Sequence, residues 1–141
     1  DTVIFFGLPL LYWGIILFSF SLILIFFFRP ANYYYLIALS ILAFNQFITR
    51  MHERYVLPFF AFFLIAALLL RSKLLFMVYI FFSLFITLNI YYSYAYYNPD
   101  YHLTPNFIIW LNQNFPLLAL IGLATWVFLL IHFIILAKKK T

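Results

Sequence analysis

Long uninterrupted runs of apolar residues restrict what this chain can fold into. Continuous runs predict helices, because half-exposed strands alternate apolar with polar residues. A helix needs roughly 20 mainly apolar residues to cross a hydrocarbon core about 30 Å thick, and only helices or closed barrels satisfy their backbone polar groups in lipid. The runs cover residues 3 or 8 to 28, 33–48, 56–70, 74 into the tyrosine cluster at 91–97, and 115–137. We therefore expect an all-α, polytopic integral membrane protein with about five transmembrane helices.

The composition agrees with a membrane environment. Of the 141 residues, 69% are hydrophobic and 8% are charged, whereas a typical soluble domain is about half apolar and about a quarter charged. The 21 Phe, 12 Tyr and 3 Trp residues supply rings that suit lipid and the membrane interface. The net charge of +5 is not accompanied by a basic, aromatic-interleaved polar surface, so we do not expect nucleic-acid binding. The absence of cysteine excludes disulfides and thiol nucleophiles.

The N-terminus differs from a signal peptide, because Asp1 opens the sequence and no basic stretch precedes the first apolar run. Residues 1–141 are interpreted as a single helical membrane module. We expect this module to be the C-terminal part of a longer protein.

The third apolar run is too short to span a membrane by itself. From Pro58 to Leu70 there are 13 residues, which make a helix only about 20 Å long at ~1.5 Å per residue. Either a longer helix begins near Met51 and kinks at Pro58, or Pro58 is a first-turn residue of a tilted, partial span. Both alternatives place residues 50–55 at a membrane boundary.

The basic residues predict the orientation of the spans. Alternating turns put six of the eight on one side, namely Arg29, Arg71, Lys73 and residues 138–140. The other side receives Arg50 and Arg54. The positive-inside rule then predicts a cytoplasmic C-terminus and an outside N-terminus, with residues 50–55 facing outward. We expect the membrane to be the cytoplasmic membrane of a bacterium or an archaeon.

A dense group of ionisable residues lies on the side that the charge rule disfavours. Arg50 and Arg54 carry forked donors suited to phosphate, and His52 can donate or accept a proton. In a helix the two arginines share a face, with Glu53 within reach of Arg50. These residues and Tyr55 are candidates for binding an anionic headgroup. The simpler alternative is a solvated turn in which arginine and glutamate pair and the histidine lies among headgroups.

Other polar residues are secondary candidates. Asp100 and His102 can form a second acid and base pair on the outer face, or belong to a wet loop with turn-forming residues. No ligand set for a metal is evident, and no cofactor is expected.

Three amides lie near the outward ends of their helices. Asn45, Gln46 and Asn89 can line a polar cleft, although hydrogen bonding between helices explains them equally well. His132, inside the last span, is interpreted as an interfacial or helix-contact residue.

The stretch from Thr49 to Pro58, which reads TRMHERYVLP between two apolar runs, resembles a late transmembrane region of glycosyltransferases of the GT-C superfamily. The closest likeness is to the bacterial protein-mannosyltransferase-like branch. In that family, a multi-spanning enzyme takes a sugar from a polyprenyl-phosphate carrier and transfers it at the outer face of the membrane.

The resemblance implies that Arg50, His52 and Arg54 approach the carrier phosphate or the sugar, and that Tyr55 and Pro58 shape the site. The family's catalytic acid lies in a first outer loop near the N-terminus of a much longer protein, and nothing in this sequence corresponds to it. The chain is therefore expected to be inactive as a transferase by itself.

The leading functional hypothesis is a membrane module of a glycosyltransferase that uses a polyprenyl-phosphate-linked sugar. Its partners would be membrane lipids, the lipid-linked sugar, and the missing N-terminal part or a partner membrane subunit. One alternative is a non-enzymatic scaffold subunit that packs against a larger partner. Another is a transporter fragment, which would carry more charges within its spans than this sequence has.

Overall fold

The computed structural model describes residues 4–5, 8–28, 32–48, 53–97, 106, 109–110 and 113–138. Within these ranges the secondary structure is almost entirely helical. It consists of α1 (Leu10–Phe27), α2 (Tyr33–Phe47), the 3-10 helix Glu53–Val56, α3 (Leu57–Leu69), α4 (Lys73–Tyr97) and α6 (Phe115–Lys138). Ahead of α1, β1 (Ile4–Phe5) pairs antiparallel with β2 (Leu8–Pro9). The expected all-α class is confirmed, because this unexpected strand pair has only two residues on each side.

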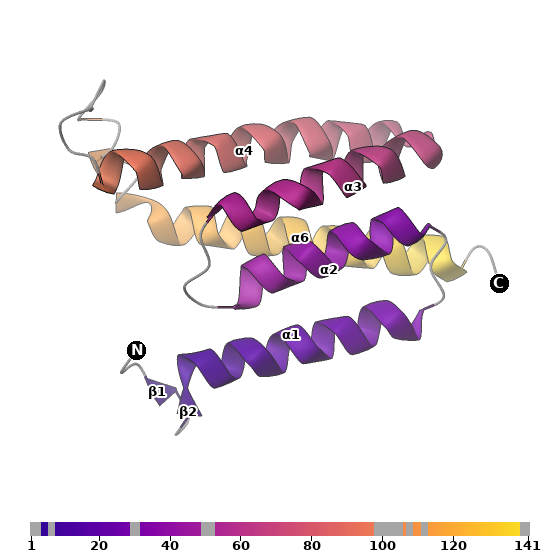
Figure 1. Cartoon of the computed structure of the whole chain (residues 1–141), viewed down its shortest axis with the longest axis horizontal. Coiled ribbons are helices and arrows are strands. Elements are labelled where there is room, and N and C mark those ends of the chain that lie inside the picture. Colours follow the sequence, from indigo (N-terminus) through magenta and orange to yellow (C-terminus); the bar gives the residue numbers. More distant parts are fainter. Residues whose placement is uncertain are drawn as a thin grey trace.

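The helices lie side by side and alternate in direction (Figure 1). The N-terminal end of the bundle holds the strand pair, the start of α3 and the end of α4. The C-terminal end holds the α3–α4 turn and the end of α6. Helix α2 is central, since it contacts α1, α3 and α6. The charged residues of the described C-terminal end, Arg71, Lys73 and Lys138, are all exposed cations.

The helix boundaries follow from particular residues. Asn32 caps α2, because its Oδ1 accepts a hydrogen bond of 3.1 Å from the backbone N–H of Tyr35. Pro58 lies in the first turn of α3, where its missing N–H removes no helical hydrogen bond. Of the two alternatives for Pro58, the first-turn position is therefore correct. Helix α4 continues through the tyrosine cluster, in which the sequence left the end of the fourth run open, as far as Tyr97.

The bundle core is built from aromatic rings and close helix contacts. The rings of Phe59 and Phe63 stack at 4.9 Å, and Phe82 from α4 meets Phe59 edge to face at 5.6 Å. Gly14 lets α1 approach α2, because a Cβ atom at this position would collide with the carbonyl oxygen of Phe47. The core thus joins α2, α3 and α4, and α1 packs along α2 with Ile25 buried in the same core.

The outer surface is unusually apolar, with large hydrophobic side chains exposed along every helix. Among the described helices, residues Lys73–Tyr92 of α4 and Pro116–Lys138 of α6 are long and apolar enough to cross a membrane. Only 17% and 28% of those two windows are buried inside the bundle, unlike the core helix of a soluble protein. These two helices indicate association with a membrane.

The other three helices are shorter. Helices α2 and α3 have 15 and 13 residues, so they are roughly 22 and 20 Å long at about 1.5 Å per residue. The apolar part of α1, Leu11–Phe27, is also below the length of the two long spans. Among the described helices, two therefore have the length and composition of membrane spans, and the expectation of about five stays a prediction.

Candidate functional site

The segment between α2 and α3 carries the candidate residues of the sequence analysis. Arg50 and His52 lie outside the described residues, as do Asp100 and His102. Glu53 and Arg54 belong to the 3-10 helix Glu53–Val56, and only their backbone is described. This short helix packs against α2, α3 and α4. The second half of the candidate segment, Glu53–Val56, is therefore packed against the N-terminal end of the bundle.

Two neighbouring residues of the 3-10 helix have opposite environments. Val56 is fully buried and anchors the segment in the core. Tyr55 is 49% exposed, so its ring stands at the surface beside that anchor. A partly exposed tyrosine next to a buried anchor can offer a fixed ring and hydroxyl to a ligand.

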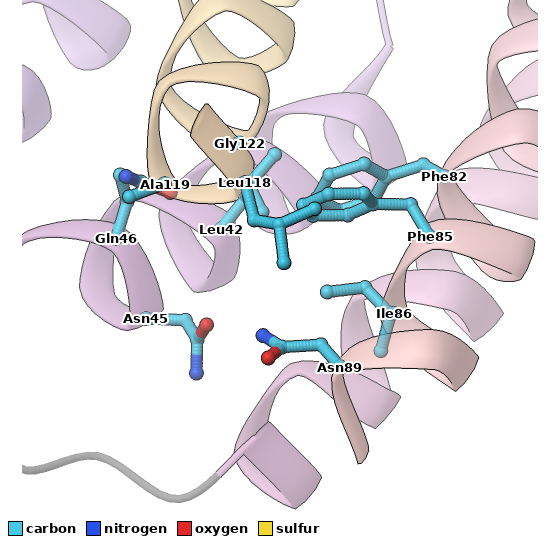
Figure 2. Close-up of a pocket in the computed structure, with 10 residues that line it drawn as sticks. All are labelled: Leu42, Asn45, Gln46, Phe82, Phe85, Ile86, Asn89, Leu118, Ala119 and Gly122. Atoms are coloured by element: carbon cyan, nitrogen blue, oxygen red, sulfur yellow. The ribbon is translucent and has the colours of Figure 1, made fainter. Parts of the chain in front are cut away.

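A cavity of about 220 Å³ lies between α2, α4 and α6 (Figure 2). Apolar and aromatic side chains form part of its wall, with Phe82, Phe85 and Leu118 among them. Three amides also line it: Asn45 and Gln46 from the last turns of α2, and Asn89 from α4. Figure 2 shows Asn45 and Asn89 pointing toward one another across the cavity. The sequence-based alternative of a polar cleft lined by these residues is confirmed.

The side-chain oxygen of Asn89 has an open hydrogen-bonding position within the described part of the chain. Its Oδ1 atom is buried and has no hydrogen-bond partner among the described residues. Leaving a buried acceptor unsatisfied costs about 1–3 kcal/mol. A hydroxyl or N–H group entering the cavity can donate to this oxygen and recover that free energy.

Gly122 of α6 makes room for the second amide. The Oε1 atom of Gln46 lies 3.1 Å from the position that a Cβ atom would take on Gly122. The glycine therefore lets the Gln46 amide lie against the α6 backbone at the cavity wall. Sequence reasoning did not single out Gly122, because a lone glycine in an apolar run carries no sign of what it faces.

At the C-terminal end of the bundle, Tyr35 of α2 makes polar contacts with α6. The Tyr35 hydroxyl donates a 3.0 Å hydrogen bond to the backbone carbonyl of Leu129 and lies 3.2 Å from Nδ1 of His132. The hydroxyl has one proton, so both bonds form when Nδ1 of His132 carries a proton and donates it. His132 is thus a helix-contact residue, as one of the sequence-based interpretations stated. Tyr35 was missed, because the interfacial tyrosine cluster in which it lies gives no sign of its buried partner.

No known family, curated protein or solved structure matches this chain. The chemistry of the site therefore rests on its own residues. Amides and aromatic rings line one cavity, and the stretch of sequence that follows α2 contains two arginines, a histidine and a glutamate. Such a combination suits a ligand with an anionic group and neutral hydroxyl groups.

Proposed function

We propose that this chain is the membrane module of a glycosyltransferase that uses a polyprenyl-phosphate-linked sugar. The observation that carries the proposal is the amide-lined cavity, in which the Oδ1 atom of Asn89 has no hydrogen-bond partner among the described residues. Neutral amides among aromatic walls suit sugar hydroxyls, which both donate and accept hydrogen bonds and present apolar C–H faces to rings.

The position of the cavity supports the same ligand. Asn45 and Gln46 immediately precede the segment that contains Arg50, His52 and Arg54. Both arginines are suited to the phosphate of the carrier, while Glu53 can hold one arginine in place. A sugar in the cavity and a phosphate at the 50–55 segment would then belong to one donor molecule.

The exposed apolar surface supports a lipid-embedded module. The hydrocarbon of a polyprenyl chain can lie against the exposed side chains of the bundle without further cost, since these already face an apolar medium in a membrane. In this proposal all five helices are embedded, the N-terminal end of the bundle is the outer end, and the C-terminus is cytoplasmic. In this proposal the catalytic acid or base comes from a partner subunit or from a region outside residues 1–141.

The phosphate part of the proposal is tested by substitution of Arg54. Losing a charge-assisted hydrogen bond typically costs about 1.5–3 kcal/mol, so Arg54→Ala should weaken binding of a labelled polyprenyl-phosphate sugar by roughly 10- to 150-fold. Arg54→Lys should recover only part of the affinity, because an ammonium keeps the charge and loses the fork. Affinity and folded yield are measured together in detergent. Binding equal to wild type in both variants, or reduced only in step with folded yield, would contradict the proposal.

One observation favours a second function. Helix α1 leaves Phe20, Ile23, Phe26 and Phe27 exposed and contacts mainly α2. Such a face suits packing against a larger membrane subunit as well as against lipid. A scaffold of this kind would bind its partner and show no affinity for the lipid-linked sugar.

A further inference from the structure

The α3–α4 turn at the C-terminal end of the bundle is tightly hydrogen-bonded. The backbone N–H of Arg71 donates to the carbonyl of Leu68 at 3.1 Å, and that of Ser72 donates to the carbonyl of Ala67 at 3.2 Å. The Ser72 Oγ atom then accepts from the backbone N–H of Leu75 at 3.3 Å and caps α4. Backbone groups at the end of α3 and at the start of α4 are thus hydrogen-bonded within a short turn. The side chains of this turn therefore project from a defined backbone.

Arg71 occupies the position in this turn that ordinarily favours glycine. Its φ angle is +47°, in the left-handed region, which an arginine adopts less readily than glycine does. The turn would therefore form at least as well without the Arg71 side chain. The arginine adds an exposed guanidinium group to a backbone that does not need it.

An apolar groove of about 510 Å³ adjoins this turn. Ala67 and Leu68 of α3 line it, together with Phe76 and Met77 of α4. Leu68 and Met77 are 62% and 61% exposed, so the groove is open to the surroundings of the bundle. Its apolar lining suits a hydrocarbon chain.

The mouth of the groove is positively charged. Arg71 and Lys73 both line it and both are exposed. None of the side chains that the structure describes carries a carboxylate, so no acidic side chain among them neutralises these two cations. A guanidinium and an ammonium group beside an apolar groove match a molecule with a phosphate at one end and a hydrocarbon chain attached to it.

We propose that this groove is a binding site for one anionic phospholipid. The headgroup phosphate lies between the Arg71 guanidinium and the Lys73 ammonium group, and one acyl chain follows the groove between α3 and α4. A lipid with a net negative headgroup is preferred over a zwitterionic one, since the two cations repel a quaternary ammonium group. The site is at the opposite end of the bundle from the amide-lined cavity and does not depend on the proposed glycosyltransferase function.

The test measures binding of phosphatidylglycerol and phosphatidylcholine to the purified chain in detergent, for example by native mass spectrometry. A cation near the surface contributes about fivefold in affinity for anionic lipid. The double variant Arg71→Gly/Lys73→Gln should therefore bind phosphatidylglycerol about 25-fold more weakly and lose the preference over phosphatidylcholine. Because glycine fits the backbone of position 71, the melting temperature should not fall.

Lys138→Gln is the matched control, since it removes a third exposed cation from the same end of the bundle without touching the groove. Its affinity for phosphatidylglycerol should stay within about twofold of wild type, less than the effect of one cation in the groove. Equal losses of phosphatidylglycerol affinity in the control and the double variant would show that the lipid is attracted by diffuse charge, and would contradict the proposed site. Wild-type binding by the double variant would overturn it as well.

A second probe tests the acyl chain. Glycerol 3-phosphate has a phosphate and no hydrocarbon chain, so it should not bind at concentrations that saturate the site with phosphatidylglycerol. Comparable binding of both probes would identify a simple phosphate site and contradict the proposed lipid groove.

Discussion

The Tyr35 hydroxyl and Nδ1 of His132 lie 3.2 Å apart, although the two residues are separated by 97 positions in the sequence. The contact joins the first turn of α2 to the C-terminal part of α6. The Tyr35 ring is buried and packs against Phe63 and Phe133 at 5.8 and 5.6 Å between ring centres. The Tyr35 side chain therefore links α2 to α6 by hydrogen bonds and packs against both α3 and α6 with its ring.

Tyr35→Phe should lower the free energy of unfolding by about 1–2 kcal/mol, because the ring packing stays while the hydroxyl's bonds to Leu129 and His132 are lost. The double variant with His132→Leu should lose less than the sum of the two single variants, with a coupling of about 0.6–1.7 kcal/mol. Unfolding of the chain in detergent measures these values. Tyr34→Phe, at an exposed neighbour, is the control, and additive losses would show that the two groups do not interact.

Gly14→Ala should destabilise the chain by about 1–3 kcal/mol, since the new methyl group meets the backbone of α2 at Phe47. Gly122→Ala meets the flexible Gln46 side chain at 3.1 Å, and we expect a smaller loss there. The comparison of melting temperatures checks both. A larger effect at Gly122 than at Gly14 would contradict the close α1–α2 contact.

The orientation can be tested with cysteines, because the chain has none of its own. If the C-terminus is cytoplasmic, Asp100→Cys should react with an impermeant thiol reagent in intact cells and Lys139→Cys should not. Labelling at position 139 and not at 100 would reverse the proposed outer and inner ends of the bundle.

The positions of the helices could be predicted from the sequence, whereas the contacts between helices could not. Apolar runs end at residues with clear physical effects, so α2 begins after the Asn32 cap and α3 begins with Pro58 in its first turn. The end of α4 was left open within the tyrosine cluster, because tyrosines at a membrane interface are compatible with continued helix as well as with loop, and the helix continues to Tyr97. The strand pair before α1 was missed, since two residues on each side are too few to show a period.

The candidate site was only partly predictable. The amides Asn45, Gln46 and Asn89 were recognised as polar groups near helix ends, but their cavity depends on how α2, α4 and α6 face one another. That packing is set by aromatic rings and by glycines whose neighbours are distant in sequence. The role of Arg50, His52 and Arg54 in binding the lipid carrier stays a prediction from the sequence.

Asn89→Leu should also report on the unpaired oxygen in the cavity. The leucine removes a buried Oδ1 atom that has no partner in the part of the chain that the structure describes. The free energy of unfolding should therefore rise by about 1 kcal/mol or stay unchanged. Thermal unfolding in detergent, without ligand, measures it. A loss above about 2 kcal/mol, typical of a disrupted core or hydrogen-bond network, would show that Asn89 has a structural role that the cavity does not explain.

The most direct measurement compares the affinities for a sugar-bearing polyprenyl phosphate and for the bare polyprenyl phosphate. Wild type should prefer the sugar-bearing carrier, and Asn89→Leu should lose about three- to tenfold of that preference, the value of one neutral hydrogen bond. Its affinity for the bare carrier should not change. Thr87→Val is the control, since Thr87 is exposed on the same helix and its hydroxyl donates to the backbone carbonyl of Ser83. If wild type shows no preference for the sugar, or if both variants lose it equally, the cavity does not bind the sugar and the central proposal is wrong.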